Sequence, residues 1–153
     1  MSTTSIIPKA VQLQQWANAP ELARKNLRSI LAAVESDEAL IDWATEALEN
    51  CGSPAQDEVG LLQQQLQSPS PDVIYWACKL IARMGPLANG CQRSLCHVFS
   101  TSENSNAVKQ QALIAMSRIG TLESESRNAL QIVATSNSAS LSSLASKVLE
   151  SPS

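Results

Sequence analysis

Apolar side chains recur along this chain in four segments that share one helical pattern. Apolar or small residues stand at i, i+4, i+7, i+8 and i+11 in the segments that begin at Leu40, Val73 and Val108, and at the first four of these positions from Leu141. This spacing forms one face of an α-helix. The aligned alanines are 33, 35 and 33 residues apart, which predicts a repeated structural unit; they are Ala44, Ala77, Ala112 and Ala145.

A second helical stripe precedes each of these segments, so each unit is predicted to be an antiparallel pair, helix A and then helix B. The pairs are expected at 20–52, 53–85, 86–120 and 121–151, with a capping helix within 1–19, at about 8–18. The A stripes contain Ala23, Leu27, Ile30, Leu31 and Val34; Val59, Leu62 and Leu66; Cys91, Leu95, Val98 and Phe99; and Ala129, Leu130, Ile132 and Val133. The prediction is an all-α fold, a right-handed α-solenoid of about four helix pairs forming one domain over 1–153.

Turn residues divide the predicted helices at regular places. A glycine follows three of the B segments, where a left-handed backbone conformation ends a helix without steric cost; these are Gly52, Gly85 and Gly120. Helix starts are expected at Pro20 and Pro86 and after the capping residues Ser53, Ser70, Ser105 and Thr121. Composition agrees with helices, since the chain has only 5 glycines and 3% aromatic residues.

The B segments resemble the helix of a known repeat. The third segment carries its fullest form, in Asn106, Val108, Lys109, Ala112, Ala115, Met116, Ile119 and Gly120, and the second keeps Asp72, Val73, Ala77 and Gly85. This pattern is similar to the short HEAT repeats of the phycobilisome-lyase type. The arginine of that pattern is replaced by Ile41, Ile74 and Ser142 in the other units. The resemblance spans about 20–150 and implies an interaction scaffold whose B helices line a concave surface. The alternative that it leaves open is an enzyme or enzyme subunit of the bilin-lyase type.

Charge and cysteine content restrict the possible partners and location. The net charge is -3, and the excess of basic residues that nucleic-acid binding needs is absent. Four cysteines without a C-x-x-C pair, beside one histidine, favour free thiols in a reducing compartment over a zinc site. No targeting segment and no run of about 18 apolar residues is found, so the expected location is cytoplasmic, without membrane contact.

The side chains that point away from the core of the B helices are the candidate binding residues. Positions two before and two after each aligned alanine lie about 200° from it around the helix. These positions, with two basic residues six after the alanine, give Asp42, Glu46, Tyr75, Lys79, Arg83, Gln110, Ile114 and Arg118. The surface is expected to change from acidic to basic along the chain. Tyr75 beside two basic residues is the kind of cluster that anchors interfaces, and it favours an acidic protein partner.

No residue pattern indicates catalysis, a cofactor or a metal ion. Cys96 and His97 are adjacent in sequence, so their side chains point about 100° apart on a helix and are poorly placed as nucleophile and base. Trp43 and Trp76 occupy one aligned position, where packing is favoured over an aromatic binding ladder. The leading hypothesis is therefore a non-catalytic protein-binding module that is a monomer or a weak homo-oligomer.

Overall fold

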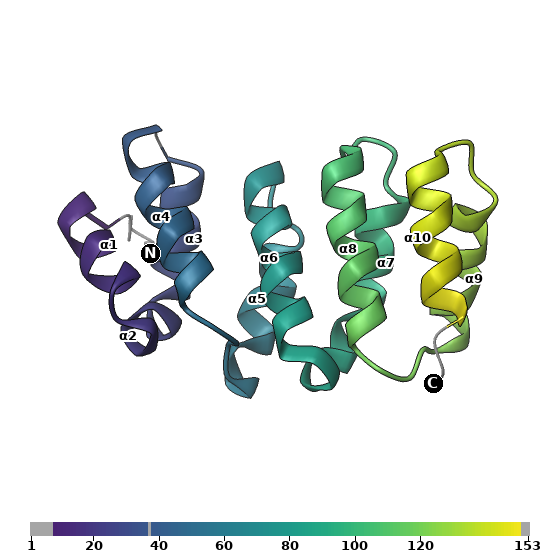
Figure 1. The fold of residues 1–153 in the computed structure, drawn as a ribbon, viewed down its shortest axis with the longest axis horizontal. Helices are drawn as coiled ribbons and strands as arrows, with labels where there is room; N and C mark the ends of the chain where they lie inside the picture. The colour runs from purple at the N-terminus through teal and green to yellow at the C-terminus, as the bar shows by residue number, and fades with distance from the viewer. Residues whose placement is uncertain (1–7, 37, 151–153) are drawn as a thin grey trace. The chain divides into compact units, whose positions relative to one another are not determined.

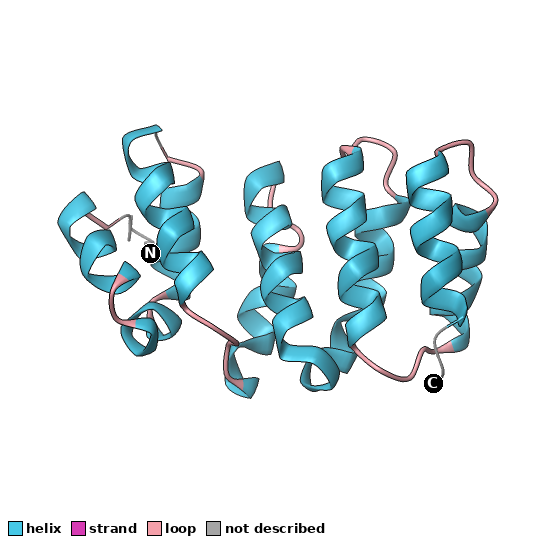
Figure 2. Ribbon diagram, in the orientation of Figure 1, coloured by secondary structure: helices cyan, strands magenta, loops and turns pink. Residues whose placement is uncertain are grey.

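A computed structural model describes residues 8–36 and 38–150, and these residues are helical with no strand among them (Figures 1 and 2). The all-α prediction is confirmed. The chain divides into two compact units, Met1–Pro54 and Ala55–Ser153. The division lies beside the predicted start of the second repeat, while a single domain over 1–153 stays a prediction. The outer ends of the predicted segments 1–19 and 121–151 fall outside the described residues. Within those residues, no helix has the length and apolar character needed to cross a membrane.

Within residues 8–36 and 38–54 the first unit contains four helices, of which α1 and α3 pack against α4. Their bounds are α1 Ala10–Ala17, α2 Pro20–Lys25, α3 Leu27–Val34 and α4 Glu38–Asn50. Helix α1 confirms the predicted N-terminal helix. The predicted single A helix is instead two helices, α2 and α3, which meet at Asn26 (φ -119°, ψ 27°). The Asn26 side chain donates to the carbonyl oxygen of Leu22 at 2.7 Å, and such a local side-chain bond competes with continuation of the helix.

The second unit places its longer helices in two layers. Helices α6 Pro71–Met84, α8 Asn106–Arg118 and α10 Ala139–Glu150 pack side by side, and α7 Gln92–Ser100 and α9 Ser124–Ala134 pack against each other behind them (Figure 1). The remaining elements are α5 Val59–Gln65 and two 3-10 helices, η1 Gln56–Glu58 and η2 Gly85–Cys91.

The aligned alanines are the most uniform feature of the core. Each has no exposed surface, as predicted. In a closely packed interior a larger side chain at these positions would meet the neighbouring helix. The A stripe of the third unit is also buried as predicted, at Cys91, Leu95, Val98 and Phe99. The last A stripe is wrong at Ile132, which is 72% exposed because it lies on the outer side of α9, away from Leu130 and Val133.

The helix ends predicted at the three glycines are correct, and so are two of the four predicted N-terminal caps. Gly52, Gly85 and Gly120 all have positive φ, at 77°, 61° and 93°. Ser70 and Ser105 accept hydrogen bonds from the backbone N–H groups of Val73 and Val108, at 3.5 and 3.3 Å, and so cap α6 and α8.

The caps predicted at Ser53 and Thr121 are wrong. After Ser53 the chain stays extended until Ala55, which precedes η1, so Pro54 does not occupy a first helical position. Helix α9 begins at Ser124, with Glu123 in the cap position, because the Thr121 carbonyl oxygen is held by Gln92 and Asn89 at 2.8 and 3.0 Å. Polar side chains from the preceding segment therefore decide where this helix begins.

Candidate functional site

Helix α6 carries the most organised part of the predicted binding surface. The Lys79 ammonium group lies 5.5 Å from the centre of the Tyr75 ring and 5.0 Å from that of Trp76. The two rings meet edge to face with their centres 6.1 Å apart. These three side chains hold one another by cation–π and aromatic contacts. Because the residues stand at i, i+1 and i+4 of one helix, the α-helix itself brings them together.

The burial of these residues changes their predicted roles. Tyr75 and Lys79 are half-buried, whereas Trp76 is only 6% exposed. Tyr75 is predicted to point away from the core, and it is only half-buried, because its ring contacts Trp76 and is partly covered by Lys79. Trp76 is a core residue, in agreement with the preferred packing role, and its ring contacts both Tyr75 and Lys79. The aligned Trp43 of α4 is half-buried.

The neighbouring helix α8 adds a second row to the same face. Arg118 is exposed, and Gln110 and Ile114 are half-buried. The Gln110 side chain donates to the hydroxyl of Ser140 on α10 at 3.2 Å, so this row is tied to the next helix. We call the outward side of α6 and α8, formed by Tyr75, Lys79, Arg83, Gln110, Ile114 and Arg118, the α6–α8 face. Arg83 is half-buried at the C-terminal end of α6.

The two acidic candidates belong to the first unit. Asp42 and Glu46 are both exposed on α4, as expected for the outward side of that helix. They lie four residues apart and therefore share one side of the helix. The six residues of the α6–α8 face lie in the second unit, so the acidic and the basic candidates belong to different units.

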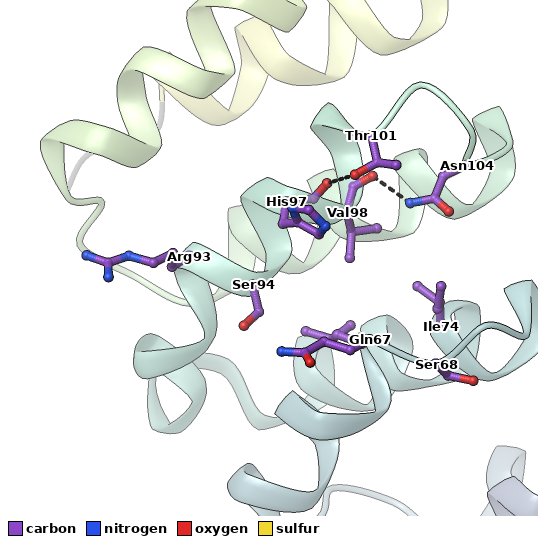
Figure 3. Close-up of a pocket in the computed structure, with 10 residues that line it drawn as sticks. Gln67, Ser68, Ile74, Arg93, Ser94, His97, Val98, Thr101 and Asn104 are labelled. Atoms are coloured by element: carbon purple, nitrogen blue, oxygen red, sulfur yellow. Dashed lines mark hydrogen bonds between the residues drawn. The ribbon is translucent and has the colours of Figure 1, made fainter.

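A groove in the second unit was not predicted from the sequence. It has a volume of about 540 Å³ and lies between α7 and the segment that joins α5 to α6 (Figure 3). Leu66, Ile74 and Val98 are its buried apolar residues. Its polar lining residues are Gln67, Ser68, Arg93, Ser94, His97, Thr101 and Asn104. A periodicity search reveals helices but not the space between them, so the sequence carried no signal for this groove.

Cys96 and His97 do not form a nucleophile–base pair in the described structure. Burial raises the pKa of the Cys96 thiol, which suppresses the reactive thiolate. His97 is exposed, as predicted, and its side chain lines the groove. All four cysteines are free, with Cys51, Cys78 and Cys91 buried and Cys96 half-buried. Burial also raises the pKa of Cys78 to about 12 and that of Cys91 to about 11, so both are neutral thiols at pH 7.

A buried glutamine is the main polar residue that sequence reasoning missed. Gln92 is 1% exposed; its amide donates to the Thr121 carbonyl oxygen, and its oxygen accepts from the Ser126 hydroxyl at 2.7 Å and from the Glu123 N–H at 3.0 Å. The hydrogen bonds of this side chain are therefore directed to the loop between α8 and α9 and to the first turn of α9. Its role is to position that loop, since buried amides are costly unless they are bonded.

Comparison with known proteins supports the fold and gives no function. No family model matches this chain, and no curated protein matches it. The crystal structure of an engineered protein, determined by the Northeast Structural Genomics Consortium, is similar to it with a TM-score of 0.55 and 17% sequence identity. The similarity covers 92% of this chain and 70% of the engineered one. At this identity the likeness concerns the helical fold alone.

Proposed function

We propose that this chain is a HEAT-like α-solenoid that acts as a non-catalytic protein-binding module, with the α6–α8 face as its contact surface. Side-by-side packing of α6, α8 and α10, with α7 and α9 behind them, supports the solenoid architecture for the second unit. Repeated helix pairs of this kind present extended surfaces rather than deep central pockets. Binding of a protein along one row of helices is the function that such a surface suits best.

The observation that carries the proposal is the arrangement of Lys79 over Tyr75 and Trp76. An exposed lysine normally loses side-chain freedom when it binds, and this cost weakens its contribution. Here the two aromatic rings already restrain the ammonium group at 5.0 and 5.5 Å. The lysine is therefore preorganised for a carboxylate of the partner, and Tyr75 supplies apolar contact area beside it.

The charge of the two helices that carry this face indicates the kind of partner. Helices α6 and α8 contain Lys79, Arg83, Lys109 and Arg118 against the single acidic residue Asp72. An acidic protein surface is attracted by this excess, and the attraction weakens as salt screens it over about 8–10 Å. We propose an acidic protein partner on this basis.

The test compares matched charge-reversal variants as baits in quantitative affinity capture. Lys79→Glu with Arg118→Glu reverses two charges on the α6–α8 face, and Arg28→Glu with Arg127→Glu reverses two charges on α3 and α9. We expect acidic proteins captured by the wild type to be retained by the control pair and lost from the α6–α8 pair, while helicity stays unchanged. Equal capture by both pairs would show that this face does not bind the partner.

A further inference from the structure

The groove beside α7 exists because the two sides of that helix are covered differently. On one side α7 packs along α9. On the other side stands α5, which ends at Gln65 and contacts η2 more extensively than it contacts α7. The chain then continues through Gln67 and Ser68 to α6. The groove lies between this connection and α7, and Ser94 and His97 line it from α7.

The far end of the groove is fixed by side-chain bonds to the end of α7. Thr101 donates to the carbonyl oxygen of His97 at 2.6 Å, and Asn104 donates to that of Val98 at 2.9 Å (Figure 3). These bonds satisfy two of the last carbonyl groups of the helix, which have no partner within it. The backbone wall is therefore held in place without a ligand, and binding does not have to order it.

The polar groups of the lining are suited to a peptide backbone. Gln67 and Ser94 approach the groove from opposite walls in Figure 3. An amide and a hydroxyl group both donate and accept hydrogen bonds, so they can pair with the N–H and C=O groups of an extended chain. Between them the buried Leu66, Ile74 and Val98 offer an apolar floor for one side chain. Because the groove is partly open to solvent, a chain can reach it from the surface.

The charge of the groove lining indicates a second feature of the peptide that it would bind. Arg93 and His97 are the ionisable side chains among the ten that line the groove, and none of the ten is acidic. Arg93 already binds a carboxylate, since its guanidinium lies 3.5 Å from Glu125, at the start of α9. Both side chains of this pair are largely exposed, and exposed ion pairs of this kind contribute little to stability. A carboxylate of a ligand can therefore replace Glu125 at the guanidinium group.

We propose that this groove binds an extended peptide segment of a partner protein in which an aliphatic residue adjoins an acidic one. The aliphatic side chain occupies the floor at Ile74 and Val98, and the carboxylate meets Arg93 and His97 at the rim. This site uses α7, the α5–α6 connection and Ile74 of α6. None of its ten lining residues belongs to the α6–α8 face, so the site does not depend on the function proposed for that face.

The experiment is an NMR titration of the full chain with acetyl-Gly-Ser-Leu-Asp-Ser-Gly-amide. Amide shifts are expected on Ser94, His97 and Val98, with Gln110, Ile114 and Arg118 of the α6–α8 face unaffected. Replacing the aspartate of the peptide by lysine should weaken binding about fivefold, the upper range for an exposed charge pair. Replacing its leucine by alanine should weaken binding about tenfold through lost apolar burial.

Two protein variants test the location. Ser94→Phe fills the groove and should abolish the shifts, whereas Ser100→Phe adds the same ring at the end of α7, outside the lining, and should preserve them. Arg93→Gln changes an exposed residue without filling the groove, and should remove the preference for aspartate over lysine. The proposal is overturned by shifts located elsewhere, by equal affinity for the two peptides, or by binding that survives in Ser94→Phe.

Discussion

Helices α4 and α6 share one apolar pattern and differ in almost everything outside it. Both place a tryptophan before the aligned alanine, Trp43 before Ala44 and Trp76 before Ala77, and both alanines are fully buried. Helix α4 carries four acidic residues and no basic one, at Glu38, Asp42, Glu46 and Glu49. Helix α6 carries Asp72 with Lys79 and Arg83. The core positions are thus repeated, while the outward positions are specific to each helix.

The difference separates the positions that hold the fold from the outward positions for which we propose a binding role. The residue two places after the aligned alanine is Glu46 in α4 and Lys79 in α6. In α6 this position gives a cation that stacks on the preceding tryptophan. An acidic side chain has no such attraction to the face of an aromatic ring, which is itself negative. The same backbone position therefore organises a surface in one helix and adds to an acidic strip in the other.

The largest expected effect tests the shared core. Ala44→Leu and Ala77→Leu should each reduce the free energy of unfolding by about 1–3 kcal/mol, because extra methylene groups overpack a closed interior. Chemical unfolding in urea measures the change. The matched controls are Ala39→Leu in α4, which is exposed, and Ala82→Leu in α6, which is half-buried, and both should cost much less. If Ala77→Leu unfolds at the wild-type urea concentration, the equivalence of the two helices is wrong.

The shared pattern also explains how much of the fold was predictable. Burial of the aligned alanines and the positive φ of Gly52, Gly85 and Gly120 follow from local residue type and spacing, and were predicted. The break at Asn26 and the late start of α9 were not, because each depends on which carbonyl group a polar side chain binds. Such choices are made by neighbours in three dimensions, and they leave no period in the sequence.

The candidate site also has features that the sequence predicted and features that it could not predict. Helical spacing predicted that Tyr75, Lys79 and Arg118 lie away from the core, and none of them is buried. Spacing could not predict that Lys79 stacks on Trp76, since that depends on side-chain rotamers. The groove beside α7 was missed for another reason. It lies beside the connection that follows α5, and helix ends are the least predictable part of a repeat.

A second difference between the helices is expected to appear at alkaline pH. The residue after the aligned alanine is Thr45 in α4 and Cys78 in α6, and burial raises the pKa of Cys78 from 9.0 to about 12. The folded state therefore stabilises the neutral thiol of Cys78. The contribution of this thiol to the free energy of unfolding is complete below pH 9 and is lost as the pH rises towards 12. At pH 10.5 the loss is about 2 kcal/mol.

Cys78→Ala isolates this contribution. Urea unfolding with reductant measures the stability of the wild type and of the variant at each pH. The stability of the wild type minus that of the variant should fall by about 2 kcal/mol between pH 7.5 and 10.5. The comparison uses the change with pH rather than the difference at one pH, so lost packing at the mutated site cancels. Cys91 remains in both proteins, and its charge repulsion with Cys78, which also raises the Cys78 pKa, is part of the measured difference. A difference that stays constant across this range would show that the Cys78 thiol ionises as freely in the folded state as in the unfolded one.

The smallest effect asks whether the cation–aromatic contact of α6 can be transferred to α4. Trp43 and Glu46 have the same three-residue spacing as Trp76 and Lys79, so Glu46→Lys should place an ammonium group near the Trp43 ring. We expect a gain of about 0.5–1 kcal/mol at an exposed site. Relief of acidic repulsion from Asp42 and Glu49 adds to this gain, and a double-mutant cycle with Trp43→Leu separates the two terms. The part of the gain that disappears without the indole belongs to the aromatic contact. If the whole gain persists in the Trp43→Leu background, charge alone explains it, and the stacking of Lys79 depends on Tyr75 as well as on the spacing from Trp76.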